Sequence, residues 1–198
     1  MRRITLFVED SGHEEFITGW IERFSRETRV DVETRPYSVR GGHGRAIQEL
    51  GHFVKDVREA RKEWPDLLVV AIDANCQGVA PRRKEIERAI GDLSFQVVLA
   101  VPDPHIERWL LLDSSAFKAV LGRGCEAPDF KCDRDRYKKL LAQAVSMAGI
   151  TPLIGGLEHA RDIVDSMDFT RMTRKEGDKV LGQFLQELQK VFKDWSRS

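Results

Sequence analysis

The stretch Leu67-Leu68-Val69-Val70-Ala71-Ile72-Asp73-Ala74-Asn75 decides the fold. Its first six residues are uncharged, apolar and rich in branched side chains. This pattern is typical of a strand that is buried on both faces of a parallel sheet. Residues 4–8 and 95–101 have the same character, so we expect them to be buried strands too. Residues 30–39 are more polar and contain Pro36, so we expect this run either to lie at an edge or to be broken in the middle.

Stretches with apolar residues at helical spacing lie between and after these runs. The first three are expected at residues 16–24, 47–57 and 82–90, so strands and helices alternate along the first half of the chain. This alternation predicts an α/β fold, namely a doubly wound sheet of about four mainly parallel strands with flanking helices. Further helices are expected, as a helical C-terminal third, at residues 105–112, 114–121, 133–148 and 178–195. We expect one domain over residues 1–198, with an α/β core at 1–112 and a helical extension at 113–198.

The composition is that of a globular chain with balanced charge. The 198 residues include 32 Lys+Arg and 32 Asp+Glu, and 41% are hydrophobic. A net charge of zero excludes a generally basic nucleic-acid-binding coat but not local basic patches. No apolar run is long enough to span a bilayer, and the first residues lead directly into a strand. We therefore expect no membrane association and no signal peptide.

The cysteine pattern predicts a reduced protein. Cys76, Cys125 and Cys132 make an odd number and contain no Cys-x-x-Cys pair. This pattern indicates neither a disulfide framework nor a thiolate zinc site. A reducing environment fits it best, so a cytoplasmic location is expected.

Acidic side chains follow the three buried runs: Glu9, Asp73 and Glu107, in that order. Because ligands bind at the carboxyl ends of parallel strands, we expect these carboxylates at one edge of the sheet. Converging carboxylates repel one another, and oxygen ligands suit Mg²⁺ or Mn²⁺, so the sequence predicts a divalent metal site. Each acidic residue taken alone could instead cap the following helix. His13 and His105 lie in the same neighbourhood and are expected to be surface or capping residues.

A glycine-rich segment, Arg40-Gly41-Gly42-His43-Gly44-Arg45, precedes the helix expected at 47–57. Glycines let backbone N–H groups approach an anion, and a helix N-terminus adds a favourable dipole. A phosphate or nucleic-acid-binding site is therefore predicted at Arg40, Gly41, Gly42, His43 and Arg45, and the alternative is a flexible turn. No Gly-Lys-Ser/Thr follows, so the segment is not a Walker A loop. Basic residues at 35–62 and 131–139 could contact a nucleic-acid backbone or form solvated helix faces.

These residues resemble a Toprim domain, the metal-binding fold of topoisomerases, primases and nucleases of the overcoming-lysogenization-defect type. The signature of that family is a Glu that ends the first strand and an Asp-x-Asp that ends a later one. Glu9 matches the first part, and Asp73-Ala74-Asn75 matches the second with Asn75 in place of the final Asp. The segment Ile106-Glu107-Arg108-Trp109-Leu110 is similar to an Ile-Glu-x-Trp-Leu element of small stand-alone Toprim-like proteins of bacteria, some of them linked to phage defence. A weaker similarity covers residues 158–169 and 179–188.

The resemblance implies a Mg²⁺-dependent (or Mn²⁺-dependent) Toprim-like nuclease or phosphodiesterase that acts on nucleic acid. Glu9, Asp73 and Glu107 would then be catalytic, with Glu9 also the candidate general base. These three residues and Asn75 would hold the metal, with Asn75 as a weaker, neutral ligand. The alternative is a catalytically weak module that binds nucleic acid or a partner protein, such as a separate ATPase. A remoter alternative is a receiver-like domain in which Asp73 is a phosphoacceptor.

Overall fold

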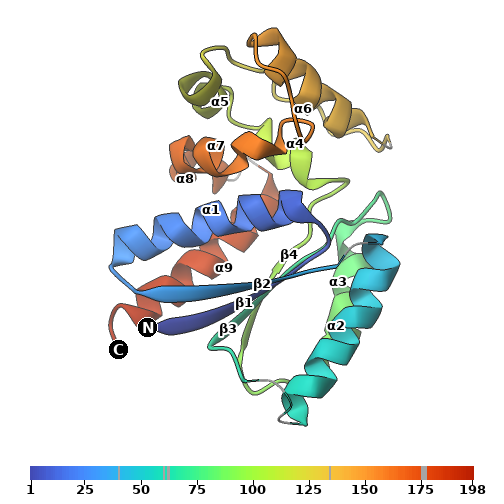
Figure 1. Ribbon diagram of the computed structural model, residues 1–198, viewed down its shortest axis with the longest axis vertical. Helices are drawn as coiled ribbons and strands as arrows, with labels where there is room; N and C mark the ends of the chain where they lie inside the picture. Colours follow the sequence, from blue (N-terminus) through green and yellow to red (C-terminus); the bar gives the residue numbers. More distant parts are fainter. Residues whose placement is uncertain (40, 60, 62, 134, 175–177) are drawn as a thin grey trace.

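In the computed structural model, four parallel strands form one sheet within the residues that the structure describes, 1–39, 41–59, 61, 63–133, 135–174 and 178–198 (Figure 1). The strand order is β2-β1-β3-β4. The central strands are β1 (Arg2–Val8) and β3 (Leu67–Ala71), and the edge strands are β2 (Val32–Ser38) and β4 (Gln96–Ala100). All the pairings are parallel. The predicted α/β fold is confirmed, and the strands lie where the apolar runs placed them.

The edge strand β2 carries Pro36 in its interior. The Arg2 N–H donates to the carbonyl of Asp31, and the Val39 N–H donates to the carbonyl of Val8. Because ladder bonds alternate along a parallel pair, these two bonds set the nitrogen of Pro36 on the side away from β1. The proline therefore costs the sheet no ladder hydrogen bond.

Helices cover both faces of the sheet (Figure 1). On one face lie α1 (Ser11–Thr28) and α9 (Lys179–Trp195), and on the other lie α2 (Gly42–Arg58) and α3 (Val79–Ile90). Successive strand side chains point to opposite faces and enter two separate buried clusters. Leu6 packs with the α1 and α9 side chains, whereas Phe7 packs with those of α2 and α3. This arrangement is the doubly wound architecture that the alternation predicts.

Shorter helices follow β4 and lie over α1 and the carboxyl end of the sheet (Figure 1). They are α4 (Ile106–Leu110), α5 (Ser114–Leu121), α6 (Arg136–Met147), α7 (Ala160–Ser166) and α8 (Phe169–Met172), with a 3₁₀ turn at Leu157–His159. Helix α6 contacts α4, and α7 contacts α1. Phe117 and Leu141 belong to the same buried cluster as the α1 side chains, so the helical part shares a core with the sheet. Among the described residues no helix has the length and apolar character to cross a bilayer.

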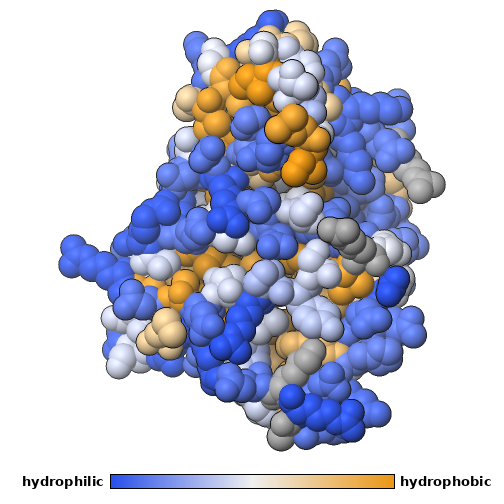
Figure 2. Space-filling model, viewed as in Figure 1, coloured by the Kyte–Doolittle hydropathy of each residue, from blue (hydrophilic) through white to orange (hydrophobic). Residues whose placement is uncertain are grey.

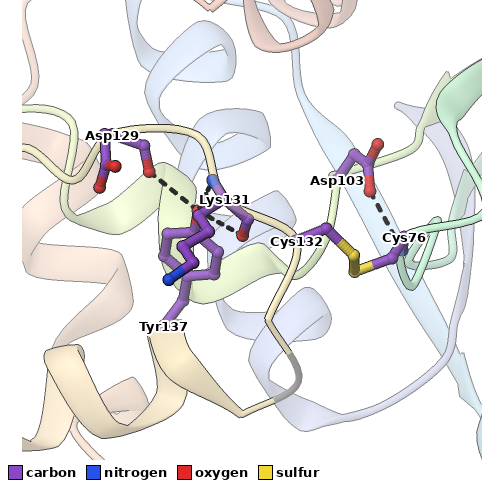
Figure 3. The surroundings of a disulfide bond; sticks show 6 residues. All are labelled: Cys76, Asp103, Asp129, Lys131, Cys132 and Tyr137. Atoms are coloured by element: carbon purple, nitrogen blue, oxygen red, sulfur yellow. Dashed lines mark hydrogen bonds between the residues drawn. A yellow bond between two sulfur atoms is a disulfide. The ribbon is translucent and has the colours of Figure 1, made fainter.

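A disulfide joins Cys76, in the loop after β3, to Cys132, in the segment before α6 (Figure 3). The expectation that the cysteines form no disulfide is therefore wrong. The two cysteines are 56 residues apart in the sequence and meet only because these two loops converge in the fold. Cys125 is a free thiol, and burial raises its pKa to about 11. The cytoplasmic location stays a prediction, and the cysteines no longer support it.

Candidate metal centre

The end of β1 and the start of α1 place the first site residues. Glu9 follows β1 directly, and Asp10 caps α1 by accepting hydrogen bonds from the N–H groups of Gly12 (2.9 Å) and His13 (3.1 Å). An aspartate at this position satisfies N–H groups that have no partner within the helix. The cap fixes the first turn of α1, and His13 in that turn is fully buried at the carboxyl end of the sheet.

Asp73 is the hub of the site and is only 4% exposed. Its Oδ1 lies 2.9 Å from His13 Nε2 and accepts a hydrogen bond from the Ile106 N–H at 3.1 Å. Its Oδ2 lies 2.9 Å from His105 Nδ1. The other ring nitrogen of His13, Nδ1, lies 2.8 Å from Asp10 Oδ1. Ionised carboxylates only accept hydrogen bonds, so both nitrogens of His13 are donors and the ring is a cation.

The charges of this cluster stabilise one another. Burial disfavours the charged ring of His13, but the carboxylates of Asp73 and Asp10 outweigh this and hold the pKa of His13 well above its usual value. Burial likewise disfavours ionised Asp73, but His13 and His105 outweigh it and keep the Asp73 pKa below its usual value. The pKa of His105 is raised because Asp73 outweighs its desolvation. Without a metal, an ionised Asp73 thus lies between the imidazolium ring of His13 and the Nδ1 of His105.

Glu9 and Glu107 lack such compensation. The Glu9 Oε2 accepts a hydrogen bond from the Asp73 N–H at 3.1 Å, yet burial and the charge of Asp73 raise the pKa of Glu9. Burial and Asp73 also raise the pKa of Glu107, which is only 3% exposed. The Oε2 of Glu107 is buried and has no hydrogen-bond partner among the described residues. A buried polar atom without a partner costs about 1–3 kcal/mol, and either a proton or a cation would offset this cost.

Three of these residues can converge on one ion. Glu9, His13 and Asp73 each offer one ligand atom, and these atoms lie within 4.8 Å of one another. Ligands around a small divalent cation at about 2.1 Å are at most about 4.2 Å apart, so a small contraction would complete the set. His13 would bind the ion through Nε2 after this nitrogen has lost its proton. Its Nδ1–H would stay hydrogen-bonded to Asp10. A carboxylate behind a metal-bound histidine is a common way of orienting the ring.

The loop after β3 is held in place around Asn75. Its N–H donates to the carbonyl of Pro104, and its backbone adopts the left-handed conformation (φ 50°) that asparagine tolerates. The buried guanidinium of Arg82 donates from Nε to the carbonyl of Asp73 at 3.0 Å. The Asn75 Nδ2 lies 3.2 Å from His43 Nδ1, so the amide nitrogen is directed to the start of α2. The role of Asn75 as a metal ligand stays a prediction.

The predicted phosphate-binding segment begins α2 beside this loop. Gly41 and Gly42 have φ values of 131° and 80°, which a side chain would strain, and the N-cap position of α2 is Gly41, which offers no side chain to cap the helix. His43 contacts Asn75, and burial followed by the charge of Arg82 lowers the pKa of His43. Arg45 lines a cavity of about 530 Å³ between α2 and the end of β2. Arg40 lies outside the described residues, and the phosphate-binding role of this segment stays a prediction.

Sequence reasoning missed two members of the cluster, His13 and His105, which were expected at the surface or in caps. The structure buries both against Asp73. One local signal points to His13: the spacing Asp10-x-x-His13 puts a cap residue and a histidine on the same first turn of a helix. That turn follows the strand whose end carries Glu9. No comparable signal marks His105, because its contact with Asp73 depends on how the chain turns after β4.

Comparisons with known proteins identify no relative of this chain: no family model, no curated protein and no solved structure matches it.

Proposed function

We propose that this protein is a divalent-metal-dependent phosphodiesterase that acts on nucleic acid. The observation that carries the proposal is the convergence of Glu9, His13 and Asp73 at the carboxyl edge of a parallel sheet. Glu107 adds a buried carboxylate oxygen without a partner in the described part of the chain. The raised pKa values of Glu9 and Glu107 indicate that their ionised forms lack stabilisation, and a bound cation would supply it. The sequence resemblance to Toprim nucleases points to the same chemistry.

The residues of the site would have distinct roles in hydrolysis. Glu9, Asp73 and His13 would hold the metal, which would supply Lewis acidity and a more acidic bound water. Glu107 lies outside this group of three, and its raised pKa brings it closer to the value at which a carboxylate accepts a proton efficiently near neutrality. Burial and this raised pKa make Glu107 a candidate proton acceptor, whereas the resemblance gave that role to Glu9. The start of α2, with Gly42 and Arg45, would bind a phosphate beside the metal.

The donor set favours Mn²⁺ over Mg²⁺. Carboxylates suit both ions, but an imidazole ligand such as His13 suits a transition-metal ion better than it suits magnesium, and Mn²⁺ is the transition-metal ion that also prefers carboxylates. We expect tighter binding of Mn²⁺ and faster hydrolysis with Mn²⁺ than with Mg²⁺.

Labelled single-stranded, duplex and plasmid substrates with Mn²⁺ or Mg²⁺ test the proposal, together with calorimetric titration of Mn²⁺. Asp73→Asn and His13→Gln should abolish cleavage and weaken Mn²⁺ binding. Glu63→Gln removes an exposed carboxylate away from the site and should change neither. Glu9→Gln provides a second readout if Asp73→Asn fails to fold. The proposal is refuted if the wild type neither binds Mn²⁺ nor cleaves, or if cleavage survives Glu9→Gln and Asp73→Asn.

A second candidate function, a module that binds a protein partner, has one observation in its favour. Large apolar side chains are exposed at the end of the molecule formed by α5 and α6, where Figure 2 shows hydrophobic residues gathered. They include Met147 (51% exposed), Leu153 (82%) and Ile154 (57%). Met147 also lines a cavity of about 530 Å³. Failure of the protein to bind Mn²⁺ would favour this candidate over an enzyme.

A further inference from the structure

Residues 129–132 form a short strap in front of α6 that is fixed at three successive points, of which Figure 3 shows those at Lys131 and Cys132. Phe130 packs on the guanidinium of Arg108. Lys131 is bound through its backbone to the hydroxyl of Tyr137. Cys132 is linked by the disulfide to Cys76, three residues after Asp73. The strap thus joins α4, which carries Glu107, to the loop that follows Asp73.

The middle of the strap is bound to one buried phenol. The Tyr137 hydroxyl accepts a hydrogen bond from the Lys131 N–H at 2.8 Å. The same hydroxyl lies 2.9 Å from the carbonyl oxygen of Asp129 and 3.0 Å from that of Lys131, and it donates its hydrogen bond to these carbonyl oxygens. Tyr137 itself is fully buried at the start of α6. The backbone of the strap is therefore held in place on a rigid helix.

This rigid strap presents an aromatic ring to solvent. Phe130 is 58% exposed, and the guanidinium carbon of Arg108 lies 5.3 Å from its ring centroid. Arg108 is buried and ion-paired with Asp178, so the cation beneath the ring is also fixed. An exposed phenylalanine contributes little to the core, and its backbone has already lost the freedom that binding would otherwise remove. The ring is preorganised for a planar partner.

Two lysines lie on the strap and on the helix that holds it, Lys131 and Lys138. Lys131 and Lys138 are exposed, and neither forms an ion pair with a carboxylate in the described part of the chain. Lys138 follows Tyr137 in α6, and its charge reaches the candidate metal centre: it contributes to the lowered pKa of Asp10 and opposes the rise in the pKa values of His105 and Glu107. The nearby carboxylate of Asp129 is paired with Arg136.

We propose that the strap is a binding platform for single-stranded nucleic acid. A base stacks on Phe130, and the phosphates on either side of it contact Lys131 and Lys138, which places the strand beside the candidate metal centre. This inference rests on the proposed function insofar as it names the substrate of that centre. A base in a duplex is stacked on both faces, so only an unpaired strand offers a free face to the ring.

Fluorescence anisotropy of a labelled fifteen-nucleotide oligothymidine, measured in EDTA, tests the platform without any metal chemistry. Wild type should bind this strand more tightly than a blunt duplex of the same length. Phe130→Ala should weaken binding about tenfold or more, because stacking of one base on an aromatic ring carries that much affinity. Phe130→Trp should retain binding. Trp64→Ala is the matched control, since Trp64 is a partly exposed aromatic residue outside the strap (39%).

The lysines and the disulfide give independent readouts. Lys138→Gln should reduce the slope of log affinity against log salt by about 0.7, the value for one phosphate contact on a single strand, whereas Lys190→Gln in α9 should not. Replacing both Cys76 and Cys132 by Ser should weaken binding by freeing one end of the strap. Cys125→Ser, which removes the free thiol, should leave binding unchanged.

Failure of the platform and failure of the proposed function are distinguishable. The platform is overturned if the wild type does not bind the strand, if it binds duplex equally well, or if Phe130→Ala behaves like Trp64→Ala. Hydrolysis of bis-p-nitrophenyl phosphate with Mn²⁺ reports on the metal centre alone. A Phe130→Ala variant that keeps this hydrolysis but loses the oligonucleotide supports the platform, and strand binding without any hydrolysis supports the platform while refuting the phosphodiesterase.

Discussion

Replacing Glu107 by methionine should stabilise the metal-free protein. Glu107 is 3% exposed, and its Oε2 has no hydrogen-bond partner among the described residues. Burial and the negative charge of Asp73 both raise its pKa, which means that both disfavour its ionised form. Methionine has a similar length and no charge, so Glu107→Met removes the unsatisfied oxygen and the repulsion without opening a large cavity.

The size of the effect follows from the unsatisfied oxygen. One buried polar atom without a partner costs about 1–3 kcal/mol, so we expect the free energy of unfolding to rise by about 2 kcal/mol. For a domain of this size, that gain raises the melting temperature by about 4–8 °C. The gain should shrink in acid, because the folded state binds the Glu107 proton more tightly than the unfolded state does. The wild type therefore becomes more stable relative to Glu107→Met as the pH falls toward the ordinary glutamate pKa of about 4.3.

Thermal unfolding in EDTA at pH 7.5 and at pH 4.5, followed by circular dichroism, measures both effects. Glu158→Gln is the opposing control, because Glu158 accepts hydrogen bonds from the N–H groups of Leu153 (2.7 Å), Ile154 (2.9 Å) and Gly156 (3.0 Å). Those bonds outweigh desolvation and lower the pKa of Glu158, so its replacement should destabilise the protein. In Mn²⁺, Glu107→Met should lose part of the stabilisation that the ion gives to wild type. A melting temperature for Glu107→Met below that of wild type in EDTA at pH 7.5 refutes the reasoning.

Three further predictions concern the rest of the structure. Asp113→Ala should lower the free energy of unfolding, measured by urea titration, by about 2–4 kcal/mol. The reason is that Asp113 caps α5 and also accepts a hydrogen bond from the Asp168 N–H at 3.0 Å. A loss below about 1 kcal/mol contradicts this prediction. In metal-free buffer, thermal stability should be greatest between about pH 4 and pH 6.5. Asp73, whose pKa is lowered, loses its contribution to the free energy of unfolding below this window. His13, whose pKa is raised, loses its contribution above the window. A His13→Gln variant that still loses stability as steeply above pH 6.5 argues against that assignment. Reducing the Cys76–Cys132 disulfide, which spans 56 residues, should cost up to about 4 kcal/mol of unfolding free energy, and equal urea midpoints with and without a phosphine reductant contradict it.

The architecture could be predicted because its strands are buried on both faces. A run such as residues 67–72 has no polar side that would let it lie at a surface, so its pattern is nearly independent of the rest of the chain. The edge position of β2 followed in the same way from its polarity and Pro36. Helix ends were less predictable: α6 begins at Arg136 rather than at 133, and Asp135 just before it has a left-handed backbone (φ 64°) that a helix cannot include.

The site was predictable only in part. The rule that ligands bind at the carboxyl ends of strands brought Glu9 and Asp73 together correctly. The histidines could not be assigned, because His13 and Asp73 are 60 residues apart and their contact depends on the packing of α1 across the sheet. The Cys76–Cys132 disulfide was missed for the same reason, since a pairing over 56 residues leaves no local pattern. Contacts of this kind are properties of the tertiary fold: the local spacing Asp10-x-x-His13 marks His13 but not its partner Asp73.

Pro36 also has a consequence for how copies of this protein meet one another. An exposed parallel edge strand offers a row of N–H and carbonyl groups that a strand from another chain can extend into a continuous intermolecular sheet. In β2 the nitrogen of Pro36 faces that outer side, so the row is interrupted near its middle. Intermolecular sheet growth at this edge would leave a carbonyl of the added strand without a donor. Pro36 therefore disfavours fibre-like assembly through this edge. Its replacement by valine would restore an uninterrupted row of N–H and carbonyl groups.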